Sequence, residues 1–328
     1  MDLDTELRTK GLVIYGRVTD GLAGNEVFIG FTSVAGAEQQ GISGARVSLL
    51  EDGTVIGKYL ETENGNYRLN LSGDSARTGR SYHLFVELPD GRQYSSKPSF
   101  MPGLAAIDRS GYDASVVEVV VNQRGLTDQR RLVQLIVETD IVEREKDFYL
   151  RWNIFSSYSF QERPRSQGGV PPPCYITNDI SGQQAHLFNG AELKVDKIDG
   201  RQLAATAIDS RFAFDYYYTV VQSTMDAAAF AYFSLIDEVS NTRGSIFDKP
   251  AAPVPGNLRN IHDPEEEVLG YFEVIRADTT RVRIRAEDVP GFVYAPCPLR
   301  LDYSREPPEC LNCLLIRNSS HHRPYFWF

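Results

Sequence analysis

The chain has 328 residues, 42% of them hydrophobic and 24% charged, with a formal net charge of -10. This composition is typical of an ordinary globular protein, and the length favours two domains because single domains cluster at about 100–150 residues. The acidic charge and the absence of any basic cluster longer than a pair exclude a nucleic-acid partner, and no apolar run approaches the roughly 18 residues of a membrane span.

Short alternating runs of apolar and polar residues fill the first hundred residues. Runs such as LVIYGRV and YHLFVEL lie between glycine, aspartate and asparagine clusters, and this spacing of short strands and turns predicts an Ig-like β-sandwich. Asn64-Gly65 and Asp90-Gly91 are typical of tight hairpin turns. We expect an amino-terminal tether over residues 1–11 and a sandwich over residues 12–104.

Three motifs within this region resemble the carboxypeptidase-regulatory-like module. They are Gly44-Ala45-Arg46-Val47-Ser48-Leu49, Gly65-Asn66-Tyr67 and Gly79-Arg80-Ser81-Tyr82-His83-Leu84. That module is a small sandwich found at bacterial surfaces and on TonB-dependent receptors. The resemblance implies presentation or adhesion without catalysis.

A second β-rich domain is expected over residues 105–328, after a linker rich in proline and small residues at 97–111. Its strand-like runs are interrupted by one helix, predicted at about residues 225–241 because strong helix formers follow Ser223-Thr224, a plausible N-cap. Gly244 is well suited to end the helix. The fold class is therefore mainly β with one α-helix.

The stretch GSIFDKPAAPVPGN, residues 244–257, follows this helix and carries four prolines. Proline fixes φ and cannot continue a helix, so we expect an extended strap that joins the helix to the last strands, with Phe247 anchored on the core. Pro255-Gly256 fits the central positions of a type II turn.

Four cysteines lie in the second half: Cys174, Cys297, Cys310 and Cys313. An even number favours two disulfides in an oxidising compartment, and three connectivities remain open. The alternative is a zinc site formed by Cys310, Cys313, His321 and His322. Adjacent histidines rarely bind one ion from a strand, so we favour disulfides and expect no metal and no cofactor.

Clustered aromatic residues are the other candidates for a site. Tyr216 and Tyr218 belong to a tyrosine run in which alternate members of a strand face the core. Tyr325, Phe326 and Trp327 could stack on a partner, and we expect them to dock onto the second domain. The five histidines lie in no nucleophile motif and no catalytic residue is nominated, so we expect no enzymatic activity.

The order of several motifs resembles the Bacteroidetes domain of unknown function 4249 family across nearly the whole chain. The motifs are Phe148-Tyr149-Leu150-Arg151-Trp152, Cys174-Tyr175, Gly244-Ser245-Ile246-Phe247-Asp248, Val254-Pro255-Gly256-Asn257, Val268-Leu269-Gly270-Tyr271-Phe272 and the ending with Cys310-Leu311-Asn312-Cys313 and Pro324-Tyr325-Phe326-Trp327.

Members of this family are predicted outer-membrane lipoproteins encoded beside TonB-dependent receptors. The resemblance implies a lipid-anchored protein on the cell-surface or periplasmic face of the outer membrane, acting as an accessory or substrate-capturing partner of such a transporter. An independent surface adhesin or glycan-binding protein is the alternative. The lipidated cysteine usual near the start is missing at Met1, so we expect a truncated amino terminus.

Overall fold

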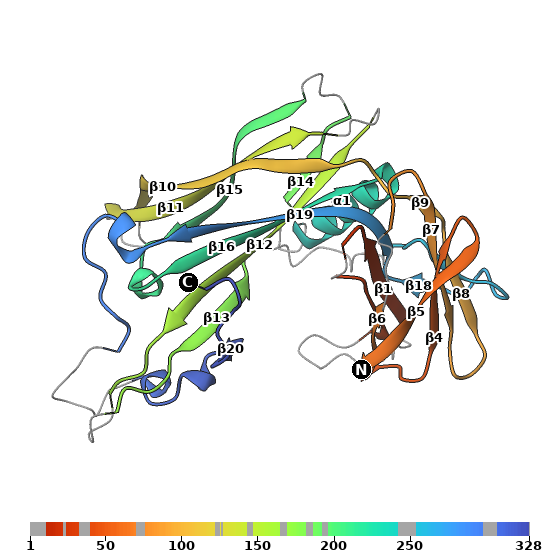
Figure 1. The fold of residues 1–328 in the computed structure, drawn as a ribbon, viewed down its shortest axis with the longest axis horizontal. Helices are drawn as coiled ribbons and strands as arrows, with labels where there is room; N and C mark the ends of the chain where they lie inside the picture. The colour runs from red at the N-terminus through yellow and green to blue at the C-terminus, as the bar shows by residue number, and fades with distance from the viewer. Residues whose placement is uncertain are drawn as a thin grey trace, which may run out of the picture.

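Two β-rich units joined by one long strand make up the computed structural model of this chain (Figure 1). The structure describes residues 11–21, 24–32, 40–69, 76–121, 125, 127–142, 147–164, 169–181, 186–191, 196–241, 254–297 and 307–327. Among these residues, α1 (Ala227–Asn241) is the one α-helix. The predicted fold class, mainly β with a single helix, is confirmed.

The amino-terminal unit is a hydrogen-bonded sheet that closes around one core. Its strands are β1 (Leu12–Thr19), β2 (Glu26–Phe31), β3 (Gln40–Gly41), β4 (Arg46–Glu51), β5 (Thr54–Glu63), β6 (Asn66–Leu69), β7 (Ser81–Glu87), β8 (Gln93–Ser96) and β9 (Ser99–Phe100). Alternate residues of each strand face inward, among them the fully buried Ile14, Leu49 and Leu84. The predicted turn at Gly65 has a φ of 77°, as a tight hairpin requires.

The carboxyl-terminal unit has two packed sheets. One consists of β10 (Ala105–Val121), β11 (Thr127–Ile141) and β15 (Lys197–Ala207). The other contains β12 (Tyr149–Phe160), β13 (Cys174–Asp179), β14 (His186–Asn189), β16 (Tyr216–Met225), β19 (Phe272–Ile284) and β20 (Ser319–Ser320). The core between them includes Leu135, Trp152 and Ile284. Short 3-10 helices are η1 (Ser210–Phe212), η2 (Ala286–Asp288), η3 (Pro308–Cys310) and η4 (Cys313–Leu315).

β19 belongs to both units and connects them. Its first residues pair in parallel with β1, from Gly16 opposite Phe272 to Thr19 opposite Ile275, and the rest pairs antiparallel with β16. β17 (Leu258–Asn260) pairs with β8, and β18 (Val268–Leu269) pairs with β1. The segment 254–275, expected in the second domain, therefore contributes to the sheet and core of the first unit.

The amino terminus of α1 differs from the prediction. Ser223 and Thr224 are buried residues of β16, and the cap is Asp226, whose Oδ1 accepts a hydrogen bond from the Ala229 amide at 2.8 Å. Ser223 and Thr224 cannot cap the helix because their backbone continues the pairing of β16 with β19. The predicted cap at Gly244, the Phe247 anchor and the strap through Pro253 lie outside the described residues.

The glycine of the Pro255-Gly256 pair has a different role from the predicted type II turn. Gly256 is not among the glycines with positive φ. A Cβ at Gly256 would lie 1.6 Å from the carbonyl oxygen of Gly270, and Gly270 itself has a φ of 97°. Glycine is required here because two backbone segments approach closely. This close approach lies next to the pairing of β18 with β1.

Asn257 holds the same region through its side-chain amide. Its Oδ1 accepts from the Phe272 amide at 2.8 Å and its Nδ2 donates to the Phe272 carbonyl at 2.9 Å, both buried. Asn257→Ala leaves both backbone groups without partners, so we expect the free energy of unfolding to fall by about 2–4 kcal/mol. Urea unfolding followed by circular dichroism measures this, and the exposed Gln129→Ala is the control. A loss below about 0.5 kcal/mol would contradict this role.

Candidate functional site

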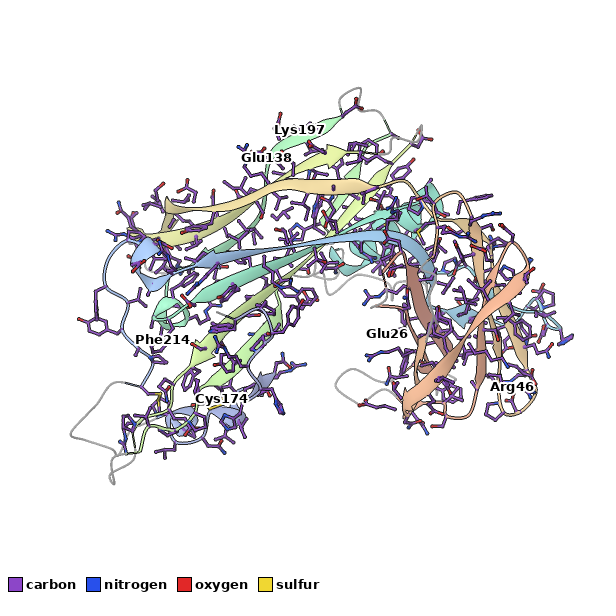
Figure 2. The ribbon with its side chains drawn as sticks, viewed as in Figure 1. Glu26, Arg46, Glu138, Cys174, Lys197 and Phe214 are labelled. Carbon is purple, nitrogen blue, oxygen red and sulfur yellow. A yellow bond between two sulfur atoms is a disulfide. The ribbon has the colours of Figure 1, made fainter. Side chains whose placement is uncertain are left out.

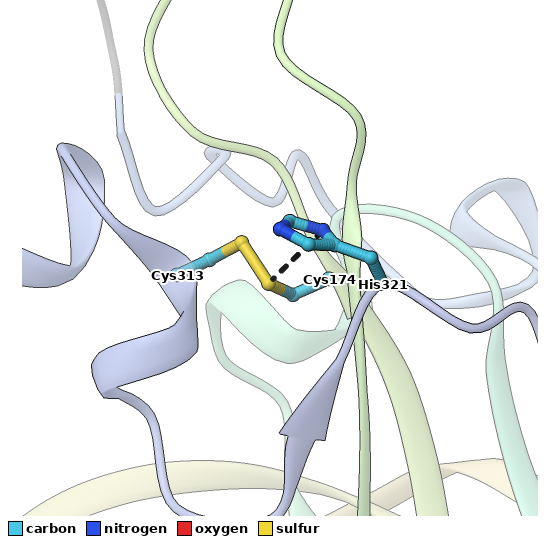
Figure 3. Close-up of side chains that lie close together, drawn as sticks. All are labelled: Cys174, Cys313 and His321. Carbon is cyan, nitrogen blue, oxygen red and sulfur yellow. Dashed lines mark hydrogen bonds between the residues drawn. A yellow bond between two sulfur atoms is a disulfide. The ribbon is translucent and has the colours of Figure 1, made fainter.

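Two disulfides attach the carboxyl-terminal segment, residues 307–327, to the rest of the chain. Cys174, the first residue of β13, bonds to Cys313 in η4, and Cys297 bonds to Cys310. The predicted disulfides are confirmed, and the structure selects one of the three connectivities. Figure 3 shows the first bond with His321 beside it.

The zinc alternative does not fit this pairing. Cys310 and Cys313 belong to different disulfides, so their sulfur atoms are not thiolates. His321 Nδ1 lies 3.7 Å from Cys174 Sγ and 3.3 Å from the carbonyl oxygen of Pro173. Cys174, Cys313 and His321 approach one another, but two of the three potential ligands are bonded to each other.

Polar contacts support the same attachment. The Cys313 amide donates to Glu162 Oε1 at 2.7 Å, and the Arg163 amide donates to the Cys310 carbonyl at 3.1 Å. β20 adds a short antiparallel pairing with Tyr175 and Ile176 of β13. The carboxyl-terminal segment is thus held to β13 by one disulfide and a backbone pairing, to the chain just beyond β12 by a buried carboxylate, and to Cys297 by the second disulfide.

The tyrosine run on β16 divides between two faces of the sheet. Tyr216 and Tyr218 are fully buried in the core between the two sheets, and the Tyr218 hydroxyl lies 2.6 Å from Thr206 Oγ1. Both are structural residues. Tyr217 faces the opposite side, where its ring centroid lies 4.7 Å from that of Trp327 and 5.6 Å from that of Phe326.

The terminal aromatics dock as expected, with one exception. Trp327 is 9% exposed and Phe326 is half-buried, whereas Tyr325 is 83% exposed. Arg281 anchors this end, because its guanidinium lies 4.6 Å from the Phe326 ring centroid and its Nη2 donates to the Tyr325 hydroxyl at 2.6 Å. A cation over an aromatic face is attracted by the ring quadrupole.

A groove of about 550 Å³ lies beside this docked segment. Its walls include Tyr175, Trp327 and the exposed Phe214, whose position Figure 2 marks together with Cys174. Arg283 forms an ion pair with Asp215 at 2.7 Å. This volume is in the range of small-molecule sites.

Arg285, another residue that lines the groove, forms an ion pair with Asp288. The pKa of Asp288 falls to about 2, chiefly because the Arg285 side chain donates hydrogen bonds to it. Sequence reasoning missed this groove, although the alternation of Arg281, Arg283 and Arg285, at the end of β19 and just beyond it, indicates a charged face.

The junction between the units contains a buried ion pair. Arg151 Nη2 lies 2.7 Å from Glu273 Oε2, and the two side chains are 10% and 13% exposed. The Arg151 guanidinium also lies 4.0 Å from the ring centroid of Phe233 on α1. Tyr232, also on α1, stacks on Tyr271 with ring centroids 4.6 Å apart. Aromatic rings of α1 therefore pack against the residues at the junction of the two units.

Three exposed leucines lie on the disulfide-anchored segment. Leu311, Leu314 and Leu315 are 63%, 50% and 59% exposed, and all three lie in or beside the two 3-10 helices that carry Cys310 and Cys313. We call these three residues the leucine cluster. Exposed large apolar side chains grouped within five residues of one segment are typical of interaction sites.

The fold and this region define a class: a two-unit β protein with a disulfide-anchored carboxyl-terminal segment. The chain belongs to the domain of unknown function family DUF4249, whose family model matches residues 1–281. Cys297, Cys310 and Cys313 lie beyond the matched range. A search of curated proteins returns no match. Within the described residues, no helix has the length and apolarity to cross a bilayer.

Proposed function

We propose that this protein is a non-catalytic, lipid-anchored protein of the outer membrane that acts as an accessory or substrate-capturing partner of a TonB-dependent transporter. Membership of the DUF4249 family supports this role through the resemblance described above. The observation that carries the proposal is the leucine cluster, presented on a segment that two disulfides hold in place.

The leucine cluster suits docking to another protein for two reasons. Burying exposed leucine side chains against a partner removes apolar surface from water, which favours association. Holding the segment in place before binding reduces the ordering cost of association. Cys310 and Cys313 lie on either side of Leu311, so little further ordering is needed when a partner binds.

Substitution within the leucine cluster tests this docking role. We expect Leu314→Glu to lower recovery of the receptor by at least about tenfold, because a charge would be buried in the interface. The measurement is affinity purification of the full-length lipidated protein from outer membranes, with co-purifying proteins identified by mass spectrometry. Leu60→Glu is the matched control, since Leu60 is 59% exposed on β5 in the other unit.

Two outcomes decide the proposal. Recovery of a TonB-dependent receptor with the unsubstituted protein and with Leu60→Glu, but not with Leu314→Glu, supports it. If no such receptor is recovered with the unsubstituted protein, or if Leu314→Glu recovers as much as the control, docking through this cluster is rejected.

A further inference from the structure

A second concave site lies on the amino-terminal unit, far along the chain from the leucine cluster. It is a pocket of about 530 Å³ over the outward-facing side of β1, β2 and β6, and it reaches the start of β19. Glu26, one of its lining residues, lies on the flank of this unit that faces the carboxyl-terminal unit (Figure 2). The strand register places its side chains in two rows.

The first row is aromatic. Tyr15 of β1 pairs with Phe28 of β2, and Phe28 pairs with Asn66 of β6. All three therefore point to the same face of the sheet. Tyr15 is 44% exposed and Phe28 is half-buried, so aromatic surface is open to a ligand at this position. The amide of the exposed Asn66 ends the row.

The second row alternates in charge. Glu273 of β19 pairs with Arg17 of β1, and Glu26 of β2 pairs with Arg68 of β6. Glu26 Oε1 and Arg68 Nη2 lie 2.9 Å apart, and Arg17 Nε donates to the Gly24 carbonyl at 2.8 Å. Arg17, Glu26 and Arg68 are exposed. Glu273 is neutralised by its ion pair with Arg151, and Glu63 of β5 also lines the pocket. The remaining lining charges, two guanidinium groups and two carboxylates, therefore balance.

The chemistry of these two rows of side chains together favours one class of ligand. Aromatic faces pack against apolar C–H surface, while guanidinium groups donate and carboxylates accept hydrogen bonds in fixed, planar arrangements. A ligand with a strong net charge would meet equal numbers of like and unlike charges here. A neutral ring compound with one C–H face and a rim of hydroxyl groups uses both rows at once.

We propose that this pocket binds a neutral oligosaccharide, with a sugar ring on Tyr15 and hydroxyl groups on Arg17, Glu26 and Arg68. The assignment deepens the proposed function by naming the class of captured substrate, and it rests on that function only for the link to transport. Binding itself requires no receptor.

The test uses the purified full chain on an array of neutral and charged glycans, followed by calorimetry with cellotriose, maltotriose, mannotriose and xylotriose. We expect at least one neutral glycan to bind, and Tyr15→Ala to weaken that binding about tenfold. Glu26→Gln is expected to weaken it as well. Tyr294→Ala is the matched control, because Tyr294 is a 74% exposed ring outside the pocket.

Three results would overturn the assignment: no neutral glycan binds, only charged glycans bind, or Tyr15→Ala and Glu26→Gln both bind as tightly as the control with unchanged melting temperatures. Sugar binding and receptor recovery are separate readouts. Loss of the first in Tyr15→Ala with receptor recovery intact separates the pocket from the docking surface, whereas sugar binding without any receptor rejects the transporter partnership alone.

Discussion

Glu273→Gln is expected to lower the free energy of unfolding by about 3–5 kcal/mol, because it leaves the buried Arg151 guanidinium without its counter-charge. Arg151 Nη2 and Glu273 Oε2 are 2.7 Å apart, and Arg151 Nε is buried without a hydrogen-bond partner. The substitution keeps the size and shape of the side chain. The loss therefore reports the charge interaction and not packing.

Urea unfolding monitored by tryptophan fluorescence measures this effect. The exposed pair of Arg68 and Glu26, 67% and 48% exposed, provides the control: Glu26→Gln is expected to cost at most about 1 kcal/mol. The double variant Arg151→Met with Glu273→Leu should recover much of the lost stability, since an apolar pair of similar volume often replaces a buried ion pair without loss. Equal losses for Glu273→Gln and Glu26→Gln would contradict this account of the junction.

Removal of the Cys174–Cys313 bond by paired replacement with alanine is expected to cost about 4–5 kcal/mol. This bond closes a loop with a sequence separation of 139, and cross-linking a long loop removes more entropy from the unfolded chain. The Cys297–Cys310 bond has a separation of 13, so its removal is expected to cost about 3 kcal/mol.

Chemical denaturation of the two double-alanine variants, compared with the unreduced parent, checks both the size and the order of these losses. A larger loss from removing Cys297–Cys310 would show that loop length does not control the effect. An unchanged free energy of unfolding for the Cys174 and Cys313 variant would mean that the carboxyl-terminal segment is held by its other contacts alone.

Local patterns in the sequence predicted the local features of the fold. Alternation of apolar residues indicated the strands, and the run after Met225 indicated α1. The parallel pairing of β1 with β19 leaves no local signal, because its partners lie more than 250 residues apart. The role of segment 254–275 in the first unit therefore required the structure. The boundaries predicted at residues 12, 104 and 105 stay predictions.

The candidate sites were likewise predicted where the sequence signal is local and missed where it depends on long-range pairing. An even cysteine count predicted disulfides. Which cysteines bond to each other depends on the strand against which the carboxyl-terminal segment packs, and for Cys313 this strand is β13. Tyr216 and Tyr218 were the predicted candidates, whereas Tyr217 contacts Phe326 and Trp327, because the register of β16 decides which member of the run faces outward. The pocket over Tyr15 depends on pairings across four strands.

Docking of the leucine cluster to a TonB-dependent transporter is tested most directly by site-specific photo-crosslinking. A photoreactive amino acid is placed at Leu315 in the full-length lipidated protein in intact outer membranes, and at Leu60 as the control. We predict a cross-link from position 315 to a TonB-dependent receptor and none from position 60. Cross-links to that receptor from position 60 alone, or to no receptor from either position, would contradict the proposed docking.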